Sequence, residues 1–519
     1  MITSLQYCRK YLKMRSDFAK STITGFIQFA VNALLVFITI PTFIRILGAE
    51  AYGVFSLLTV IGSLNTFANL GLSTSLVRFL AKQGKSFESN LDIVVILLII
   101  SIITIPIFSC VLLFKEIIVE SIFSIPVGMK SDAIWLFTMM LISTLFILYG
   151  QIFSAILDSM QKVYLTNIYQ MINNISYWVF MLLALLMGYS LRGIGIAMVA
   201  STVIWFCIVT IGAISAWGGL SLKGMSLDGI RGSARKQLKY GLQVYSGGMI
   251  SIFYEPLTKI ILAKFLGVTE VGIFDIGLKV RSQLMGLAGK LMYPIYPILS
   301  HLEDKTKTRL VVHDVEQKLF LVILPLVTII LLITKTIVTQ MFSVHGELIA
   351  ITISSISSAF LVGSITVMPN YLFLLAKGHA SKVIILQSIN VVVNLVVIIV
   401  CIPIMGYYAV LFANALAILC SWVTSLYYQW NYLNSLIFDS FRQMFKVIIT
   451  FIVSLFMGLS ITLLLKSSIG VLIVCPIAVL ITTSLLYRYT CVVNQVDIAR
   501  YFGENSIVGG MAIRLLVKK

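Results

Sequence analysis

Long apolar runs separated by short polar stretches cover almost the whole chain. The runs that predict helices are 19–43, 52–77, 91–114, 133–156, 168–187, 193–216, 241–264, 271–296, 319–341, 348–375, 383–402, 407–429, 446–465 and 469–487. Each run has about the 20 residues that a helix needs to cross the hydrocarbon core of a bilayer. Strands of a membrane barrel would instead alternate polar and apolar residues. The pattern therefore predicts an all-α polytopic membrane protein with about fourteen transmembrane helices.

The composition supports this class and leaves little room for enzyme chemistry. Of 519 residues, 59% are hydrophobic and 11% are charged, and the mean hydropathy is +1.02. Soluble domains have about a quarter of their residues charged. The seven cysteines are scattered singly, and no two of the four histidines lie three or four residues apart. No Walker loop or nucleophile elbow occurs, so we expect no metal, no cofactor and no catalytic residues.

The basic residues behind the net charge of +18 are concentrated on one side of the predicted spans. Most of the lysines and arginines lie in the head, in alternate loops and in the tail. The remaining loops hold five: Arg45, Lys115, Lys130, Arg192 and Lys466. The positive-inside rule predicts that both termini are cytoplasmic. The basic surplus then indicates contact with anionic membrane lipids and not nucleic acid. Residues 1–20 lack the apolar core and cleavage site of a secretory signal peptide.

An internal repeat divides the predicted helices into two sets. At one fixed offset, Leu47, Gly48, Gly53 and Phe55 match Leu266, Gly267, Gly272 and Phe274. Chance and the common use of glycine at helix ends are the alternative explanation. Because six spans separate the two copies, the repeat is parallel, with its axis along the membrane normal. The predicted parts are a basic head (1–18), a six-helix lobe (19–217), a cytoplasmic linker (218–239), a second six-helix lobe (240–430), two extra helices (446–487) and a cytoplasmic tail (488–519).

Ionisable residues inside predicted spans concentrate in the seventh and eighth. They are Glu255, Lys259, Asp275, Lys279, Arg281 and Lys290. Such residues are costly in a bilayer and usually face a partner or a cavity. One interpretation is a pair of salt bridges, Glu255–Lys259 and Asp275–Lys279, each one helical turn apart. The other is a cationic cavity that binds an anion, because the cations outnumber the acids. Arg281 is then the best candidate for a phosphate, which guanidinium binds bidentately.

Uncharged polar side chains in other spans complete the set of candidates. They include Gln28 and Asn32 in the first span and Asn65 and Asn69 in the second. Lining of a cavity and hydrogen bonding between helices explain them equally well. Glu255 and Asp275 are the candidates for coupling transport to an ion, because they are the carboxylates deepest in any span.

The stretch from Pro41 to Ala81 resembles the opening of Wzx-type polysaccharide flippases. The residues that carry the resemblance are Pro41, Leu47-Gly48, Tyr52-Gly53, Asn69-Leu70-Gly71-Leu72 and Arg78, and in the second hairpin Pro256-Leu257-Thr258-Lys259, Leu266-Gly267 and Pro297. These flippases belong to the multidrug/oligosaccharidyl-lipid/polysaccharide exporter superfamily, which implies a MATE-like fold. They often have Asp-Leu-Gly-Leu where this chain has Asn69-Leu70-Gly71-Leu72, which puts any role for an acid there in doubt.

The resemblance implies that the chain moves an undecaprenyl-pyrophosphate-linked oligosaccharide across the bacterial inner membrane for O-antigen or capsule. The headgroup would pass through a cationic central cavity by alternating access. A polymerase and a chain-length regulator would be possible protein partners. The candidate substrate-binding residues are Arg281, Lys279, Lys259, Lys290, Arg78, Asn65, Asn69, Gln28 and Asn32, with Glu255 and Asp275 for ion coupling.

Two other functions compete with this one. A cation-coupled multidrug antiporter of the same superfamily would carry a membrane carboxylate in its first helix, but residues 18–43 contain no Asp or Glu. An envelope polysaccharide polymerase or ligase would have a long periplasmic loop with arginines. The longest outer loop here, about 115–132, holds only Lys115 and Lys130 as cations.

Overall fold

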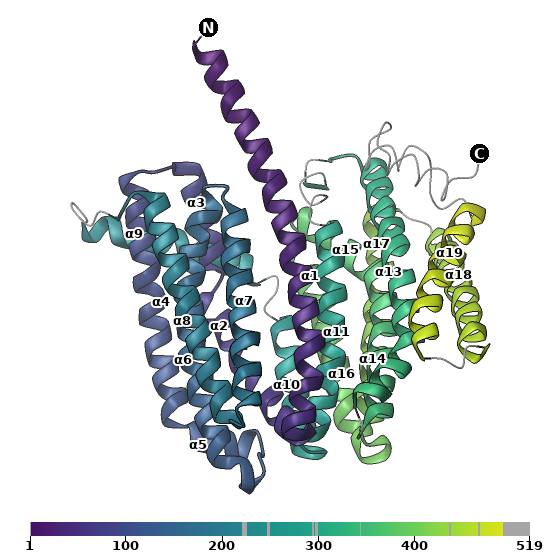
Figure 1. Cartoon of the computed structure of the whole chain (residues 1–519). Helices are drawn as coiled ribbons and strands as arrows, with labels where there is room; N and C mark the ends of the chain where they lie inside the picture. Colours follow the sequence, from purple (N-terminus) through teal and green to yellow (C-terminus); the bar gives the residue numbers. More distant parts are fainter. Residues whose placement is uncertain are drawn as a thin grey trace. The chain divides into compact units, whose positions relative to one another are not determined.

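Helices form all the regular structure among the described residues (Figure 1). The computed structural model describes residues 2–220, 226–246, 250–292, 295, 299–300, 302–342, 344–434, 437–464 and 468–490. No strand occurs in these ranges. The prediction of an all-α protein is therefore confirmed. Pro297, Lys466 and the tail from residue 491 onward lie outside the described residues.

The chain divides into two compact units, Met1–Gly272 and Ile273–Lys519. The longer helices of unit 1 are α1 (Ile2–Leu58), α2 (Ser63–Asn69), α3 (Leu72–Gln83), α4 (Phe87–Leu113), α6 (Lys130–Ser159), α7 (Val163–Leu186), α8 (Leu191–Trp217), α9 (Leu227–Ser246) and α10 (Tyr254–Phe265). Its short elements are η1 (Thr59–Gly62), α5 (Lys115–Ile117), η2 (Ile118–Ile122), η3 (Val127–Met129) and η4 (Ile250–Phe253). Helix α11 (Val268–Met292) begins in unit 1 and continues into unit 2. Unit 2 also holds α13 (Lys305–Met341), α14 (Gly346–Val362), η6 (Gly363–Val367), α15 (Met368–Ala376), α16 (Ala380–Met405), α17 (Tyr408–Leu433), α18 (Ile437–Leu464) and α19 (Ser468–Thr490).

The described helices account for the expected membrane spans. Ten segments are long and apolar enough to cross a bilayer. The other four expected spans are 52–77, 241–264, 271–296 and 446–465. The first is divided among the end of α1, η1, α2 and α3, and the second between α9 and α10. The third overlaps α11, which carries several charges, and the fourth overlaps α18. The chain is a multi-pass membrane protein.

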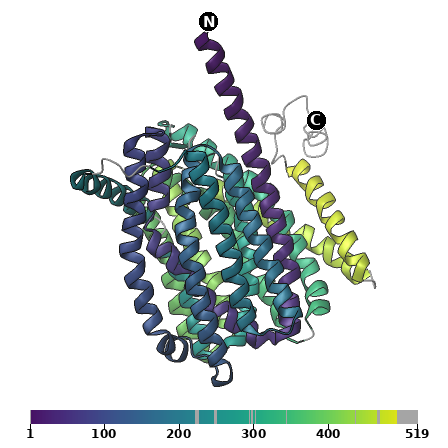
Figure 2. The ribbon, with the colours of Figure 1, turned by 60° about the vertical axis from the view of Figure 1, so that its left-hand side comes forward.

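A kink at Gly48 separates the first two expected spans. Helix α1 runs to Leu58, and only Gly48 departs from helical geometry, with φ 87° and ψ 165°. The break therefore falls inside the expected gap between residues 43 and 52, although helical residues come closer to it on both sides than expected. Apart from Gly48, residues 44–51 include no residue that stops a helix, so a single left-handed glycine makes the bend. The first turns of α1 extend beyond the ends of α3 and α7 of the same unit (Figures 1 and 2).

The two copies of the repeated motif meet inside unit 1. Gly48 and Gly267 both have positive φ, 87° and 116°. A Cβ atom on Gly53 would lie 1.8 Å from the carbonyl oxygen of Val268, and one on Gly272 would lie 3.1 Å from Cα of Gly53. The matched glycines therefore adopt similar conformations and let two backbones approach at one crossing, as small residues do between membrane helices. This agrees with the interpretation of the motif as a repeat.

Side-chain packing and buried hydrogen bonds hold unit 1 together. Helices α6 and α8 lie side by side (Figure 1). The Trp205 ring fits against Gly150, where a Cβ atom would lie 2.3 Å from the ring. Figure 2 shows the first turns of α9 projecting sideways from the other helices of the unit. Asp92 of α4 anchors α9, because its carboxylate accepts bonds from Ser233 and, at 2.7 Å, from Nζ of Lys236.

Unit 2 packs around α13 and α14. The apolar core contains Leu319, Ile323 and Leu324 of α13, which are fully buried. The side chain of Asp304 caps the start of α13 by accepting a hydrogen bond from the backbone N–H of Thr306 at 2.8 Å. This bond lowers the pKa of the Asp304 carboxyl. The extra helix α19 also packs on α13, and the Tyr487 hydroxyl donates to the Phe320 carbonyl at 3.3 Å.

Large apolar side chains cover the outer surfaces of both units. Ile102 and Ile211 in unit 1 are 71% and 69% exposed, and Ile404 in unit 2 is 83% exposed. Monomeric soluble proteins seldom expose such surfaces, whereas lipid acyl chains solvate them favourably. The exposed apolar surface is thus where the chain contacts the bilayer.

Candidate functional site

The first pair of candidate charges, Glu255 and Lys259, forms a salt bridge in unit 1. Lys259 Nζ lies 2.7 Å from a carboxylate oxygen of Glu255, 3.3 Å from the Ser56 carbonyl oxygen and 3.4 Å from the Thr59 hydroxyl. The Lys259 side chain is fully buried, whereas that of Glu255 is 51% exposed. Lys259 thereby ties α10 to the end of α1 and to η1. The geometry favours the salt-bridge interpretation for Lys259 and leaves Glu255 accessible.

A double variant tests whether Glu255 serves only as the salt-bridge partner of Lys259. Glu255→Gln is expected to lower the thermal stability of the detergent-solubilised protein, because it leaves Lys259 as a buried cation without its carboxylate. Removing one partner of a buried pair costs up to about 3–5 kcal/mol, and the half-exposed Glu255 places this case near the lower value. Glu255→Gln with Lys259→Gln should recover both stability and export. Lys264→Gln, at an exposed position of the same helix, is the matched control. An unstable double variant would contradict the salt-bridge interpretation, whereas a stable double variant without export would favour ion coupling by Glu255.

Asn69 is held by hydrogen bonds within unit 1. Its side-chain amide nitrogen donates to Ser73 Oγ at 2.8 Å and to Gln151 Oε1 at 2.9 Å, and its oxygen accepts from the backbone N–H of Ser73. Leu70 and Gly71 adopt left-handed conformations between α2 and α3. Asn69 thus caps α3 across a tight break. An aspartate would preserve the cap but not the donor to Gln151, which gives a physical reason for asparagine here.

The other candidates of unit 1 lie at separate places. Gln28 and Asn32 are half-buried on α1, and Asn65 is half-buried on α2. Arg78 is exposed on α3, and its guanidinium lies 4.1 Å from the centroid of the Tyr240 ring. This cation–π contact joins α3 to α9. Among the described residues of unit 1, no hydrogen bond joins any of these four side chains to Lys259.

The second group of candidate charges lies on α11 in unit 2. Asp275 is buried, with 1% of its surface exposed, while Lys279, Arg281 and Lys290 are half-buried. Helix α11 thus carries three cations and one carboxylate within unit 2. An excess of positive charge on a membrane helix attracts an anion, so α11 could contribute to an anion-binding site.

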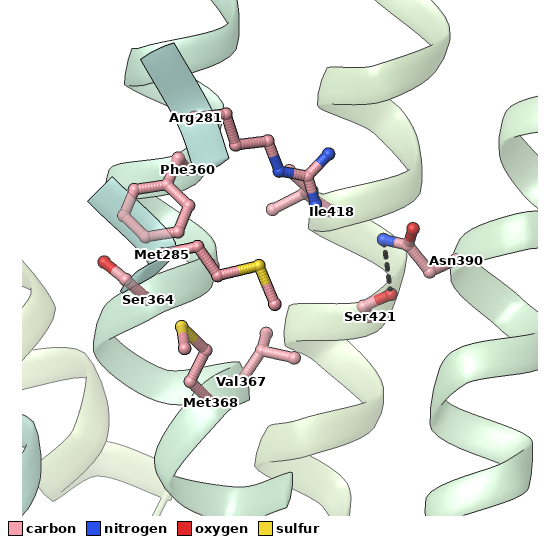
Figure 3. Close-up of a pocket in the computed structure, with 10 residues that line it drawn as sticks. Arg281, Met285, Phe360, Ser364, Val367, Met368, Asn390, Ile418 and Ser421 are labelled. Carbon is pink, nitrogen blue, oxygen red and sulfur yellow. Dashed lines mark hydrogen bonds between the residues drawn. The ribbon is translucent and has the colours of Figure 1, made fainter. Parts of the chain in front are cut away.

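Arg281 lines a cavity formed entirely by residues of unit 2 (Figure 3). The lining residues are Arg281 and Met285 of α11, Phe360 of α14, Gly363, Ser364 and Val367 of η6, Met368 of α15, Asn390 of α16 and Ile418 and Ser421 of α17. The Arg281 guanidinium extends toward the helix that carries Ile418. Asn390 donates to Ser421 Oγ at 3.3 Å on the same wall. The cavity therefore offers a guanidinium, an amide and two hydroxyls among apolar walls.

A π-helical turn, η6, forms one wall of this cavity. It interrupts the long segment from α14 to α15 and brings Ser364 and Val367 to the cavity. Such turns inside α-helices are rare and occur frequently at functional sites. The cavity has a volume of about 100 Å³, enough for about three waters at their share of liquid volume. It suits a group of phosphate size and is far smaller than an oligosaccharide.

Two features were missed by sequence reasoning. The π-helical turn at Gly363–Val367 has no signature in the apolar pattern. Glu316 of α13 is 8% exposed, and Gln429 of α17 donates to its carboxylate at 2.6 Å. Glu316 lies three residues before the predicted span 319–341, and it was therefore not among the candidates. A period of 3.6 extended backward from Leu319 would have placed it on the buried face.

Comparison with known proteins identifies the family. A family model described as polysaccharide biosynthesis protein matches residues 18–303, more than half of the chain. The chain belongs to the polysaccharide biosynthesis protein family. The recognition made from the sequence motifs is thereby confirmed. No curated protein matches the chain significantly.

Solved structures share the fold of this family member at low sequence identity. A lipid II flippase, MurJ, in an inward closed conformation has a TM-score of 0.66 and 15% identity, over 92% of this chain and 100% of that one. An inward-facing MATE multidrug resistance transporter of the MOP superfamily has a TM-score of 0.61 and 14% identity, over 77% and 96%. A MOP superfamily transporter from Pyrococcus furiosus has a TM-score of 0.57 and 14% identity, over 82% and 97%. The predicted MATE-like fold is confirmed.

Proposed function

We propose that this family member is a flippase for an undecaprenyl-pyrophosphate-linked oligosaccharide that supplies O-antigen or capsule synthesis. It would act in the bacterial inner membrane with both termini in the cytoplasm, by alternating access. Polymerase and chain-length regulator proteins would receive the translocated unit. The family and the fold support a transporter or flippase of lipid-linked substrate over an enzyme.

The observation that carries the proposal is the Arg281 cavity. The planar guanidinium donates two parallel hydrogen bonds to two oxygens of a phosphate and keeps its charge at any physiological pH. The neighbouring hydroxyls of Ser364 and Ser421 and the Asn390 amide are neutral hydrogen-bonding groups, which suit phosphate oxygens as well as sugar hydroxyls. Because the cavity is of phosphate size, the sugars would enter only after it widens. The lipid tail would remain in the bilayer, where the outer surface is apolar.

The competing functions have weaker support. The fold includes multidrug transporters, so it does not exclude a drug antiporter, but the first helix lacks a carboxylate between residues 18 and 43. A cation-rich α11 would also repel cationic drugs. For a polymerase or ligase, the outer loop would need free cations. Lys130 of that loop forms an ion pair with Glu120, which leaves little positive charge to bind an anionic substrate.

A deletion strain separates these functions. We expect loss of the surface polymer and accumulation of lipid-linked units in the cytoplasmic leaflet, inaccessible to a membrane-impermeant sugar-oxidising reagent added to spheroplasts. Single units that react with the reagent would instead indicate a polymerase. Unchanged surface polymer with raised drug sensitivity would indicate an antiporter. The wild-type gene supplied in trans is the control and should restore the polymer.

A further inference from the structure

A buried carboxylate outside the Arg281 cavity forms a separate polar site in unit 2. Glu316 lies on α13 and is 8% exposed. Its neighbours along the helix, Val312, Val315, Leu319 and Phe320, all belong to the apolar core. An ionised carboxylate in such surroundings is costly unless hydrogen bonds or a cation compensate. The groups around Glu316 therefore decide its charge state.

Two side chains contact the Glu316 carboxylate. Gln429 Nε2 of α17 donates to Oε1 at 2.6 Å, and His313 Nδ1 lies 3.7 Å from Oε2 on the same face of α13. Among the described residues, no lysine or arginine pairs with this carboxylate. The charge at Glu316 is thus balanced only by a neutral amide and by an imidazole that is itself titratable.

The other charged and titratable groups nearby have their own partners. On α13, Lys318 pairs with Asp314, and Arg309 donates to the Asn434 carbonyl at the end of α17. The Tyr487 hydroxyl of α19 donates to the Phe320 carbonyl. From α17, Tyr432 stacks on His379 with 4.6 Å between ring centroids, and Tyr428 packs beside Tyr432. These groups leave His313 as the titratable side chain that faces Glu316.

His313 connects the buried carboxylate to solvent. Its side chain is 39% exposed, whereas that of Glu316 is 9% exposed. Gln317 Nε2 lies 3.4 Å from the other ring nitrogen, Nε2. The imidazole therefore has one nitrogen directed to Glu316 and the other near the surface side of α13. In the orientation that the basic loops predict, this end of α13 faces the cytoplasm.

We propose that Glu316 is a proton-binding site, loaded and unloaded through His313, with Gln429 as a neutral partner. The imidazolium gives its Nδ1 proton to Oε2 of the carboxylate, so one N–H bond breaks, one O–H bond forms, and a charge pair becomes a neutral pair. A small side-chain rotation closes the 3.7 Å separation, as occurs for many proton-transfer pairs. The neutral imidazole then takes a new proton from solvent.

Proton binding at Glu316 would alter the contact between α13 and α17. The bond from Gln429 is charge-assisted while Glu316 is ionised, and such bonds are roughly twice as strong as neutral ones. Protonation therefore weakens the direct link between these two helices of unit 2. Because the site is separate from the Arg281 cavity, the proposal does not depend on which substrate is transported.

The test is infrared difference spectroscopy of the purified full-length protein in lipid vesicles, without substrate. Between about pH 5 and 8, the range in which an imidazole titrates, the wild type should gain a protonated-carboxyl C=O band as the pH falls. Glu316→Gln should lose that band. The matched control Glu347→Gln, at a residue whose side chain is 78% exposed, should keep it. A band that persists in Glu316→Gln, or no band in the wild type, would overturn the proposal.

A second variant keeps the test decisive if Glu316→Gln fails to fold. His313→Gln leaves the carboxylate and its Gln429 bond in place but removes the relay. After a pH jump, the band should rise at least tenfold more slowly than in the wild type and reach a similar final amplitude at low pH. A rate equal to that of the wild type would show that protons reach Glu316 by another route and would exclude His313 as the relay.

Discussion

Arg281→Ala is expected to reduce export of the surface polymer by at least about 25-fold. Losing a charged, hydrogen-bonded contact to a bound phosphate costs about 2–5 kcal/mol, and each 1.4 kcal/mol is a factor of ten. Arg281→Lys should restore export only partly, because an ammonium keeps the charge but loses the bidentate geometry. The measurement is polymer on the surface of a deletion strain that expresses each variant, normalised to the amount of variant protein in the membrane.

The control for this prediction is Lys335→Ala in the same unit. Lys335 is 74% exposed and pairs with Glu347 at 3.6 Å, so its loss removes one positive charge without touching the cavity. Its export should equal that of the wild type. If Arg281→Ala exported normally at normal abundance, phosphate binding at this cavity would be wrong. If the alanine variant were absent from the membrane, the Arg281→Lys variant would still decide between charge and geometry.

Most of the helices could be predicted from the sequence because apolar runs of membrane length leave few alternatives. The errors fall where the apolar pattern carries no information. Residues 44–51 were expected to separate two spans, and the helix does break there at Gly48, but the residues on either side of Gly48 remain helical. Inside a membrane, a break in a helix leaves backbone N–H and C=O groups without hydrogen-bond partners, which costs free energy. Polar residues alone therefore do not end it.

The candidate site was only partly predictable for a related reason. Arg281 was singled out because a guanidinium binds phosphate bidentately and keeps its charge, and the structure places it at a cavity. Lys259 was a candidate for the same cationic cavity, but the structure gives it Glu255, Ser56 and Thr59 as partners. Ser56 of α1 and Thr59 of η1 lie 203 and 200 positions away in sequence, so only the fold could reveal them. Glu316 was missed because polar residues flank it in the sequence, so the hydrophobic pattern did not indicate that its side chain is buried.

Replacing Gly53 is expected to have the largest effect on stability of any glycine variant in unit 1. An alanine Cβ at Gly53 would lie 1.8 Å from the Val268 carbonyl oxygen, which is backbone and cannot rotate away. Overpacking costs typically about 1–3 kcal/mol, and this backbone clash places Gly53→Ala at the upper end or beyond it. Gly272→Ala meets Gly53 at 3.1 Å and should cost about 1 kcal/mol.

Gly62→Ala is the matched control for these two variants, because nothing lies within 4 Å of its Cβ position. Its backbone is helical, with φ −58°, so alanine should stabilise it by up to about 1 kcal/mol through helix propensity. The measurement is thermal unfolding of each variant in the same detergent. The expected order of stability is Gly62→Ala, wild type, Gly272→Ala, Gly53→Ala. Wild-type stability in Gly53→Ala would mean that the two copies of the motif do not cross there. The order is specific to a backbone crossing, because a general intolerance of alanine would lower the stability of all three variants alike.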